Sequence, residues 1–162
     1  MRIMRPKIVP DVVSAGQVLS LPPQATVREA ARLMAAENVA ALLVAEEAKL
    51  LGIFTERDVS ARVVAAGLDP DTTRLGQVMT PEPRSLAPDD SISEALDMMR
   101  RHSFRHLPVL DDHGRPVAMV SVRDLYAVVQ DQLEHDIMNR DAWILGIADA
   151  WGDEPAPLEA AQ

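Results

Sequence analysis

Two stretches of this 162-residue chain carry the same pattern of residues. Thr26-Val-Arg-Glu-Ala-Ala-Arg-Leu-Met34 aligns with Ser91-Ile-Ser-Glu-Ala-Leu-Asp-Met-Met99, with Thr26 over Ser91. In each copy a hydroxyl residue stands three positions before a glutamate, which is the capping box that begins a helix. Apolar residues then recur at helical spacing. A duplicated pattern predicts two pseudo-symmetric half-domains, and they must share a core because a unit of about 50 to 60 residues is marginal alone.

The residues around each predicted helix complete a larger unit. An extended segment precedes the helix, and two short apolar strands and a closing helix follow it. The predicted strands span residues 41–45, 50–54, 107–110 and 116–120. Each copy is therefore a β-α-β-β-α unit, and the predicted fold class is α+β. The predicted organisation is a first repeat at 10–68, a linker rich in Gly, Pro, Asp and Thr at 69–83, and a second repeat at 84–130.

The C-terminal part of the chain differs from the repeats in charge. The formal net charge is -9, and most of it comes from residues 130–162. Apolar residues at helical spacing predict an amphipathic helix over 131–151, whose apolar face packs on the body of the protein or forms a dimer seam. Trp143 and Trp151 fall in this helix and are candidates for anchoring an interface. Residues 152–162 are acidic and rich in Pro and Ala, so we predict a disordered tail.

The composition also excludes several classes of function. The chain has no cysteine, which excludes a disulfide framework, an iron–sulfur cluster and a thiol nucleophile. The acidic balance argues against duplex nucleic acid as a partner. No apolar run approaches the length of a membrane span, and the N-terminus lacks the apolar core of a secretion signal. We therefore predict a cytoplasmic protein that does not bind a membrane.

Neither metal chemistry nor catalysis is indicated by the remaining residues. The four histidines fall on different predicted elements without close ligand spacing: His102, His106, His113 and His135. The order of a Ser-His-Asp triad and the glycine-rich phosphate loops are also absent from the sequence. We predict no metal site and no enzymatic activity.

A second repeated motif joins a strand, a hydroxyl and a carboxylate. It is Gly52-Ile-Phe-Thr-Glu-Arg-Asp58 in the first copy and Ala118-Met-Val-Ser-Val-Arg-Asp124 in the second. One interpretation is another capping box, which only starts the closing helix. The other is a ligand site, because a helix start attracts anions and a carboxylate accepts hydrogen bonds from a ribose diol. Arg57 and Arg123, each beside the carboxylate, are candidate phosphate donors.

The repeat pair, these motifs and the segment Phe104-Arg-His-Leu-Pro-Val109 resemble cystathionine-beta-synthase (CBS) domains. Two such domains in tandem form a Bateman module. The segments Val78-Met-Thr-Pro81 and Ser85-Leu-Ala-Pro-Asp-Asp-Ser-Ile92 are typical of the second domain of such a pair. The resemblance covers about residues 10–130. It implies a non-catalytic regulatory module that binds AMP, ADP, ATP or S-adenosylmethionine as an effector in two clefts and signals by a conformational or assembly change.

The resemblance also implies which residues form each cleft. The first site would contain Leu19, Val39, Ile53, Thr55, Arg57, Asp58, Arg105 and His106. The second site, which we expect to be weaker, would contain Arg84, Phe104, Met119, Ser121, Arg123 and Asp124. The basic pair Arg105-His106 is one-sided, because the first copy has Ala40-Ala41 at that position. We therefore expect the first site to take a phosphorylated ligand and the second to be empty or to take a less charged one.

Partners follow from the same resemblance. We expect a homodimer and a downstream protein that reads the ligand-dependent change. The alternative is a ligand-free dimerisation scaffold that acts through protein–protein contacts. In that case Thr55 and Ser121 would serve only as helix caps.

Overall fold

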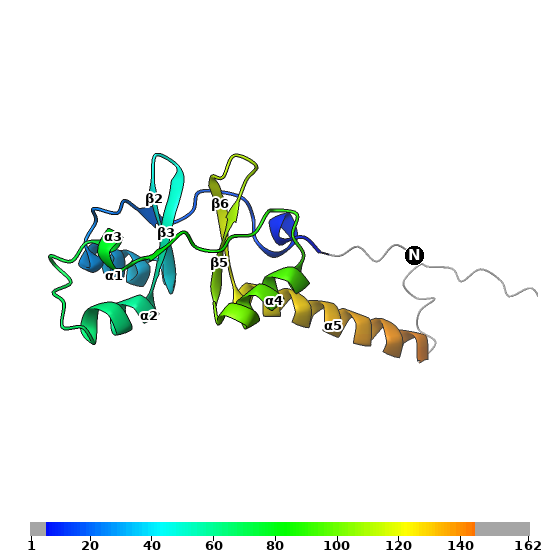
Figure 1. Ribbon diagram of the computed structural model, residues 1–162. Helices are drawn as coiled ribbons and strands as arrows, with labels where there is room; N and C mark the ends of the chain where they lie inside the picture. The colour runs from blue at the N-terminus through cyan, green and yellow to red at the C-terminus, as the bar shows by residue number, and fades with distance from the viewer. Residues whose placement is uncertain (1–5, 145–162) are drawn as a thin grey trace, which may run out of the picture. The chain divides into compact units, whose positions relative to one another are not determined.

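A computed structural model describes the backbone of residues 6–144 and the side chains of residues 6–138 (Figure 1). The chain divides into two units, residues 1–125 and 126–162. The first unit holds both repeats, and the predicted α+β class is confirmed. The elements of the first repeat are β1 (Ser20–Leu21), α1 (Val27–Ala36), β2 (Ala41–Glu46), β3 (Lys49–Thr55), α2 (Glu56–Asp58) and η2 (Val59–Val64). Those that follow are α3 (Leu75–Val78), β4 (Thr80–Pro81), α4 (Ile92–His102), β5 (His106–Leu110), β6 (Pro116–Ser121) and α5 (Val122–Ile144).

The helices of both repeats begin where the sequence predicts. Thr26 accepts a hydrogen bond from the amide of Glu29 at 3.2 Å, and the Glu29 carboxylate accepts one from the amide of Thr26 at 2.6 Å. Ser91 and Glu94 make the same pair of contacts at the start of α4. Both predicted capping boxes are therefore confirmed. They fix the point at which the chain turns from extended segment to helix.

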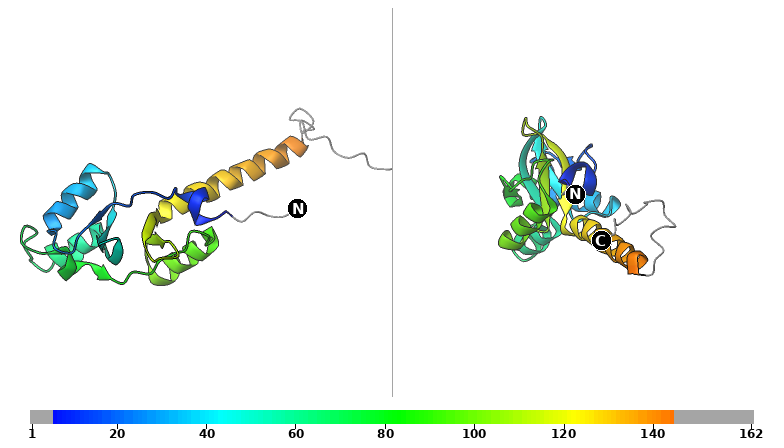
Figure 2. Two further views of the ribbon diagram at one scale, coloured as in Figure 1. Left: turned by 90° about the horizontal axis from the view of Figure 1, so that it is seen from above. Right: turned by 90° about the vertical axis from the view of Figure 1, so that its right-hand side faces the viewer.

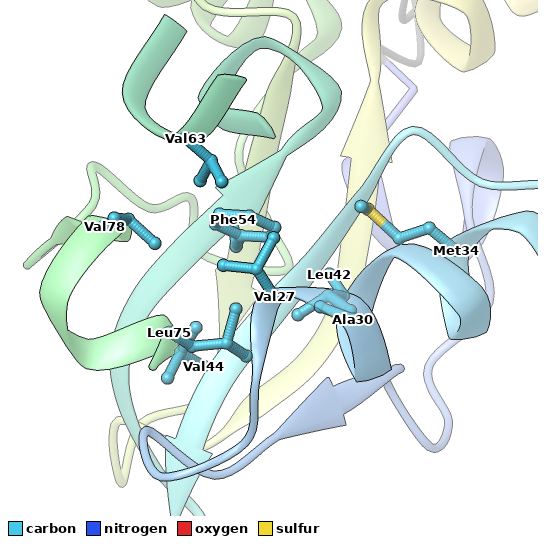
Figure 3. Packing of buried hydrophobic residues seen from close by; sticks show 9 residues of the cluster. All are labelled: Val27, Ala30, Met34, Leu42, Val44, Phe54, Val63, Leu75 and Val78. Atoms are coloured by element: carbon cyan, nitrogen blue, oxygen red, sulfur yellow. The ribbon is translucent and has the colours of Figure 1, made fainter. Parts of the chain in front are cut away.

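The sheet of the first repeat has strand order β1-β2-β3-β4, with β1 parallel to β2 and the other pairs antiparallel. Side chains alternate between its faces. Leu42, Val44 and Phe54 point into the cluster beneath the helices (Figure 3). The opposite face is also apolar and carries Ala41, Leu43 and Ile53, against which Met119 of the second repeat packs. Burial on both faces explains why β2 is apolar at every position before its last residue, the exposed Glu46.

The second repeat has a smaller sheet. β5 and β6 form an antiparallel pair, and the predicted extended segment before α4 contributes only a parallel bridge between Leu86 and Val109. The side chains of Leu107, Val109 and Val120 are buried.

Each repeat is completed by the segment that precedes the other one. The N-terminal turn η1 (Ile8–Val12) lies against the second repeat, where the amides of Ile8 and Val9 donate to the carbonyls of Asp90 and Pro88 (Figure 2). Correspondingly, α3 packs on the first repeat, and Leu75 donates to the carbonyl of Ala25. Ile8 and Leu75 are both fully buried. The predicted linker 69–83 thus contains packed structure, namely α3 and β4, and the predicted start at residue 10 falls inside η1.

Residues 131–144 of the predicted C-terminal helix are helical and belong to α5, which continues without a break from the closing helix of the second repeat. Residues 145–151 of that prediction lie outside the described residues. Leu133 and Ile137 on this helix are 57% and 51% exposed. Whether they form a dimer seam stays a prediction. The side chain of Trp143, the residue Trp151 and the predicted tail 152–162 lie outside the described residues. No helix in the described part of the chain is both long and apolar enough to cross a membrane.

Candidate functional site

The hydroxyl–carboxylate motif has the same geometry in both repeats. The amide and hydroxyl of Thr55 both donate to Oδ2 of Asp58, at 2.9 and 2.8 Å. The amide and hydroxyl of Ser121 donate to Oδ2 of Asp124, at 2.7 and 2.6 Å. The capping interpretation of the motif is therefore correct as far as these contacts go. It accounts for one oxygen of each carboxylate.

The second carboxylate oxygen distinguishes the two repeats. Oδ1 of Asp58 lies 3.4 Å from Nε of Arg62, one helical turn further on. Among the described residues, none donates a hydrogen bond to Oδ1 of Asp124. Both carboxylates line cavities, and Asp58 is 7% exposed while Asp124 is half-buried. Each motif thus caps a helix and still presents one oxygen atom as an acceptor.

A cavity of about 300 Å³, here called the first pocket, adjoins the Asp58 motif. Its wall combines residues of both repeats and includes four arginines and a single carboxylate, that of Asp58. The lining residues are Ala40, Ile53, Thr55, Arg57, Asp58, Arg62, Thr80, Pro83, Arg84, His102, Ser103, Phe104, Arg105, His106 and Leu107. The cavity is within the size range of small-molecule sites.

An aromatic surface forms part of the first pocket. The rings of His102 and Phe104 stack with centroids 5.3 Å apart and planes inclined by 19°. Ser103 between them ends α4 in the left-handed conformation, with φ 56°. This reversal brings two rings that are close in sequence into parallel contact. Phe104 is half-buried and lines the first pocket, so it contributes apolar aromatic surface there.

A larger cavity of about 700 Å³, here called the second pocket, adjoins the Asp124 motif. It contains Ser121, Arg123, Asp124 and Met119, all of which the sequence assigned to one site. Most of the rest of the wall comes from the first repeat. The other lining residues are Ala31, Met34, Ala35, Asn38, Val39, Ala40, Ala41, Glu56, Val59, Arg105, His106 and Val122.

The structure exchanges three of the predicted slot residues between the pockets. Phe104 and Arg84, which the sequence grouped with Ser121, line the first pocket beside Thr55. Val39, which the sequence grouped with Thr55, lines the second pocket. Each pocket therefore joins the carboxylate motif of one repeat to a residue that lies shortly after the first helix of the other repeat, Phe104 in the first pocket and Val39 in the second. The sequence grouped residues by copy, whereas the packing of the two repeats brings opposite copies together.

Leu19 lines neither pocket. It packs against the cluster beneath the helices, while its neighbour Val18 packs on the opposite face with Ala41 and Ile53. Both residues lie in the segment that leads into β1, and in extended backbone adjacent side chains point to opposite faces. Ile53 lines the first pocket together with Thr55 and Asp58.

The basic pair Arg105 and His106 lines both pockets. Burial lowers the pKa of His106, and the neighbouring Arg105 lowers it further. Asp124 and Glu56 act in the opposite direction, and Arg123 adds to the lowering. The net effect favours a neutral imidazole near pH 7. A negatively charged ligand in either pocket would oppose this shift.

Several lining residues were not singled out from the sequence. Arg62 could have been found from the sequence, because it stands four positions after Asp58 and that spacing places two helical residues side by side. His102 and Ser103 were missed because a helix C-terminus carries no motif for ligand binding. Thr80 and Pro83 belong to a segment interpreted as a linker.

The described residues contain no cluster of three or more histidine, aspartate or glutamate side chains that could hold a metal ion. Both pockets combine arginine side chains, a carboxylate oxygen and apolar surface, which are groups that can contact an organic ligand with polar and apolar parts.

Comparison with known proteins places these features in a family. The CBS domain model matches residues 2–65 and 75–131, which cover most of the chain. The chain is 40% identical over 121 residues to the CBS domain-containing protein CBSCBSPB1 of Arabidopsis thaliana, a match that spans 75% of this chain but only 22% of that protein. It is 38% identical over 109 residues to the CBS domain-containing protein YhcV of Bacillus subtilis, spanning 67% of this chain and 76% of YhcV.

A solved structure is similar as well. It is a CBS domain protein from Pyrobaculum aerophilum in complex with AMP, with 29% sequence identity and a TM-score of 0.64. The similarity covers 72% of this chain and 92% of the archaeal one.

Proposed function

The chain belongs to the CBS-domain family, and we propose that it is a regulatory module that binds adenine nucleotides in its two pockets. The observation that carries the proposal is the first pocket. There a carboxylate oxygen, an aromatic ring and four arginines line one cavity. These are the groups that a ribose diol, a purine base and a phosphate each require.

The first pocket suggests how a nucleotide is held. The ribose hydroxyls donate to Oδ1 of Asp58, the oxygen that capping leaves available. The base lies against Phe104 and Ile53, where stacking and apolar contact favour binding. The phosphate then faces Arg105 and His106, where guanidinium and imidazole groups donate hydrogen bonds. Burial of a polar ligand is favourable here because each donor or acceptor on the ligand meets a hydrogen-bonding partner in the pocket.

The second pocket favours a ligand of lower charge. Arg105 and Arg123 are balanced there by the carboxylates of Glu56 and Asp124. The pocket is also larger, and its lining contains no Phe, Tyr or Trp side chain. We therefore assign the phosphorylated ligand to the first pocket and expect weaker binding of adenosine-like compounds in the second. The archaeal relative with bound AMP supports an adenosyl effector for this fold.

The proposed activity is binding without turnover. A ligand can shift the packing of the two repeats only by its differential affinity for two arrangements. A homodimer in the cytoplasm, read by a downstream protein, is the setting that we propose for this change. The chain matches only 22% of the plant relative, so the activity of that whole protein is not transferred. The alternative remains a scaffold that dimerises without a ligand.

Thermal unfolding of the purified chain with AMP, ADP, ATP or S-adenosylmethionine at about 1 mM separates the two functions. A ligand at 100 times its dissociation constant adds about 2.7 kcal/mol to the free energy of unfolding, which raises the melting temperature measurably. Asp58→Ala should abolish most of the shift, and Asp124→Ala should abolish only the weaker component. Absence of a shift with all four ligands would contradict nucleotide binding and favour the scaffold.

A further inference from the structure

We propose that Arg62 is a positioning residue that couples the Asp58 carboxylate of the first pocket to the segment between the two repeats. The inference rests on the proposed nucleotide binding at that pocket. It adds a way in which binding there affects the backbone between the two repeats. It concerns one side chain that touches three groups on two separate parts of the chain.

The contacts of the Arg62 guanidinium define the bridge. Its Nη1 donates to the carbonyl oxygens of Val78 and Met79, at 2.9 and 2.7 Å. Its Nε lies 3.4 Å from Oδ1 of Asp58. The carbonyl contacts are short and the carboxylate contact is long, so the guanidinium is anchored more firmly to the segment than to the acid. Among the described residues, no acceptor is found for Nη2, and Arg62 lines the first pocket.

The segment that Arg62 holds is itself closely fitted to the first repeat. Ile53 pairs with Thr80 across β3 and β4, and the amide of Glu82 donates to the carbonyl of Leu51 at 3.0 Å. Gly52 permits this approach, because a Cβ there would lie 2.9 Å from the carbonyl oxygen of Thr80 and would clash with the Met79 side chain. A shift of the segment would therefore change the packing of β4 on β3. The chain continues from β4 directly into the second repeat.

The bridge is present in only one repeat. Val128 occupies the position after Asp124 that Arg62 occupies after Asp58. A valine cannot bond a carboxylate or a carbonyl. The coupling is accordingly specific to the first pocket, the one with four arginines.

A nucleotide in the first pocket acts on both ends of the contact. Ribose hydroxyls that donate to Oδ1 of Asp58 fix the carboxylate, and a phosphate oxygen within reach of Nη2 supplies the guanidinium with a further acceptor. Both changes restrain the Arg62 side chain, and the carbonyls of Val78 and Met79 are restrained with it. Binding should therefore protect the backbone of residues 79–82 from opening.

Hydrogen exchange of the full chain, with and without saturating AMP, tests this coupling. The readout is the exchange rate of the amides of Met79, Thr80 and Glu82. In the wild-type chain we expect AMP to slow their exchange several-fold. In Arg62→Ala we expect faster exchange without AMP, about tenfold weaker AMP binding and no slowing when AMP is saturating.

Two matched variants accompany Arg62→Ala. Arg57→Ala removes the same charge from the same pocket but leaves the contacts to Val78 and Met79 in place, so AMP should still slow exchange in the segment. Arg62→Lys keeps the charge opposite Asp58, but one ammonium group cannot reproduce the planar set of three contacts, so most of the slowing should be lost. This second variant also serves if Arg62→Ala fails to fold.

The outcomes distinguish a failure of the Arg62 coupling from a failure of the proposed nucleotide binding. If AMP slows exchange equally in the wild type, Arg62→Ala and Arg62→Lys, the coupling is wrong and nucleotide binding stands. If Arg62→Ala alters exchange by the same factor with and without AMP, Arg62 is a structural contact only, and the coupling is again wrong. If titration calorimetry detects no binding of AMP, ADP or ATP to the wild type, both proposals fail.

Discussion

Both hydrogen bonds that Thr55 donates to the side chain of Asp58 end on the same carboxylate oxygen, Oδ2, which accepts from the amide and from the hydroxyl of Thr55 at 2.9 and 2.8 Å. The other oxygen, Oδ1, takes no part in this cap and faces Arg62. The structural and ligand-binding roles of Asp58 are thus divided between two atoms of one side chain. Substitutions that affect the atoms unequally can measure the two roles separately.

Asp58→Asn should weaken nucleotide binding while largely preserving the helix start. An asparagine carbonyl oxygen still accepts from Thr55, but the amide nitrogen in place of Oδ1 cannot accept from a ribose hydroxyl. We expect about a tenfold loss of AMP affinity by titration calorimetry. The free energy of unfolding should change by less than in Asp58→Ala, for which about 0.5–2 kcal/mol is expected. Equal destabilisation by both variants without any loss of affinity would assign Asp58 to capping alone.

The first pocket combines Asp58 of the first repeat with Phe104 of the second. We therefore predict that Phe104 contributes to ligand binding beside Asp58. In an Asp124→Ala background, where only the first pocket remains intact, Phe104→Ala should lower AMP affinity by about 1 kcal/mol or more through the loss of stacking. Val39→Ala in the same background should have little effect, because Val39 lines the other pocket. Calorimetric titration of both variants is the measurement. A larger effect from Val39 than from Phe104 would restore the grouping by copy.

The pKa of His106 predicts a stability that falls on acidification. Because this pKa is lowered in the folded chain from 6.5, the unfolded chain binds more protons just below that pH. The free energy of unfolding therefore decreases as the pH falls from about 7 towards 5, where the unfolded form of His106 is protonated first. In urea denaturation, His106→Gln should show a smaller decrease than the wild type. His113→Gln, which alters an exposed turn residue, is the control, and identical pH dependence in all three proteins would refute the prediction.

Ile8→Ala should destabilise the chain even though Ile8 precedes both predicted repeats. The side chain is fully buried against the second repeat, and removing it leaves a cavity that costs about 2–5 kcal/mol. Urea denaturation measures the loss. Val64→Ala is the matched exposed control, since Val64 is 70% exposed and its truncation should change stability by less than about 0.5 kcal/mol. If Ile8→Ala proved as mild as Val64→Ala, packing of the N-terminal turn on the second repeat would be in doubt.

Local sequence patterns were sufficient for most of the elements. The Thr26–Glu29 and Ser91–Glu94 pairs begin helices because a capping box acts within four consecutive residues. The apolar runs form strands for a similarly local reason. No local sequence signal indicated α3 within the predicted linker, because α3 is short and is held by Ala25, a residue far from it in sequence.

The sequence by itself determined the duplication, the α+β unit, the family resemblance and the two hydroxyl–carboxylate pairs, since each depends on spacing within a short segment or on the similarity of two segments. Only the tertiary structure decided that Phe104 stands with Asp58 and Val39 with Asp124, that Leu19 faces the helices, and that Arg62 reaches Val78. These relationships arise where separate segments pack together. Packing depends on which face of each element is buried against which neighbour, and that pairing is not written in the spacing of either segment alone.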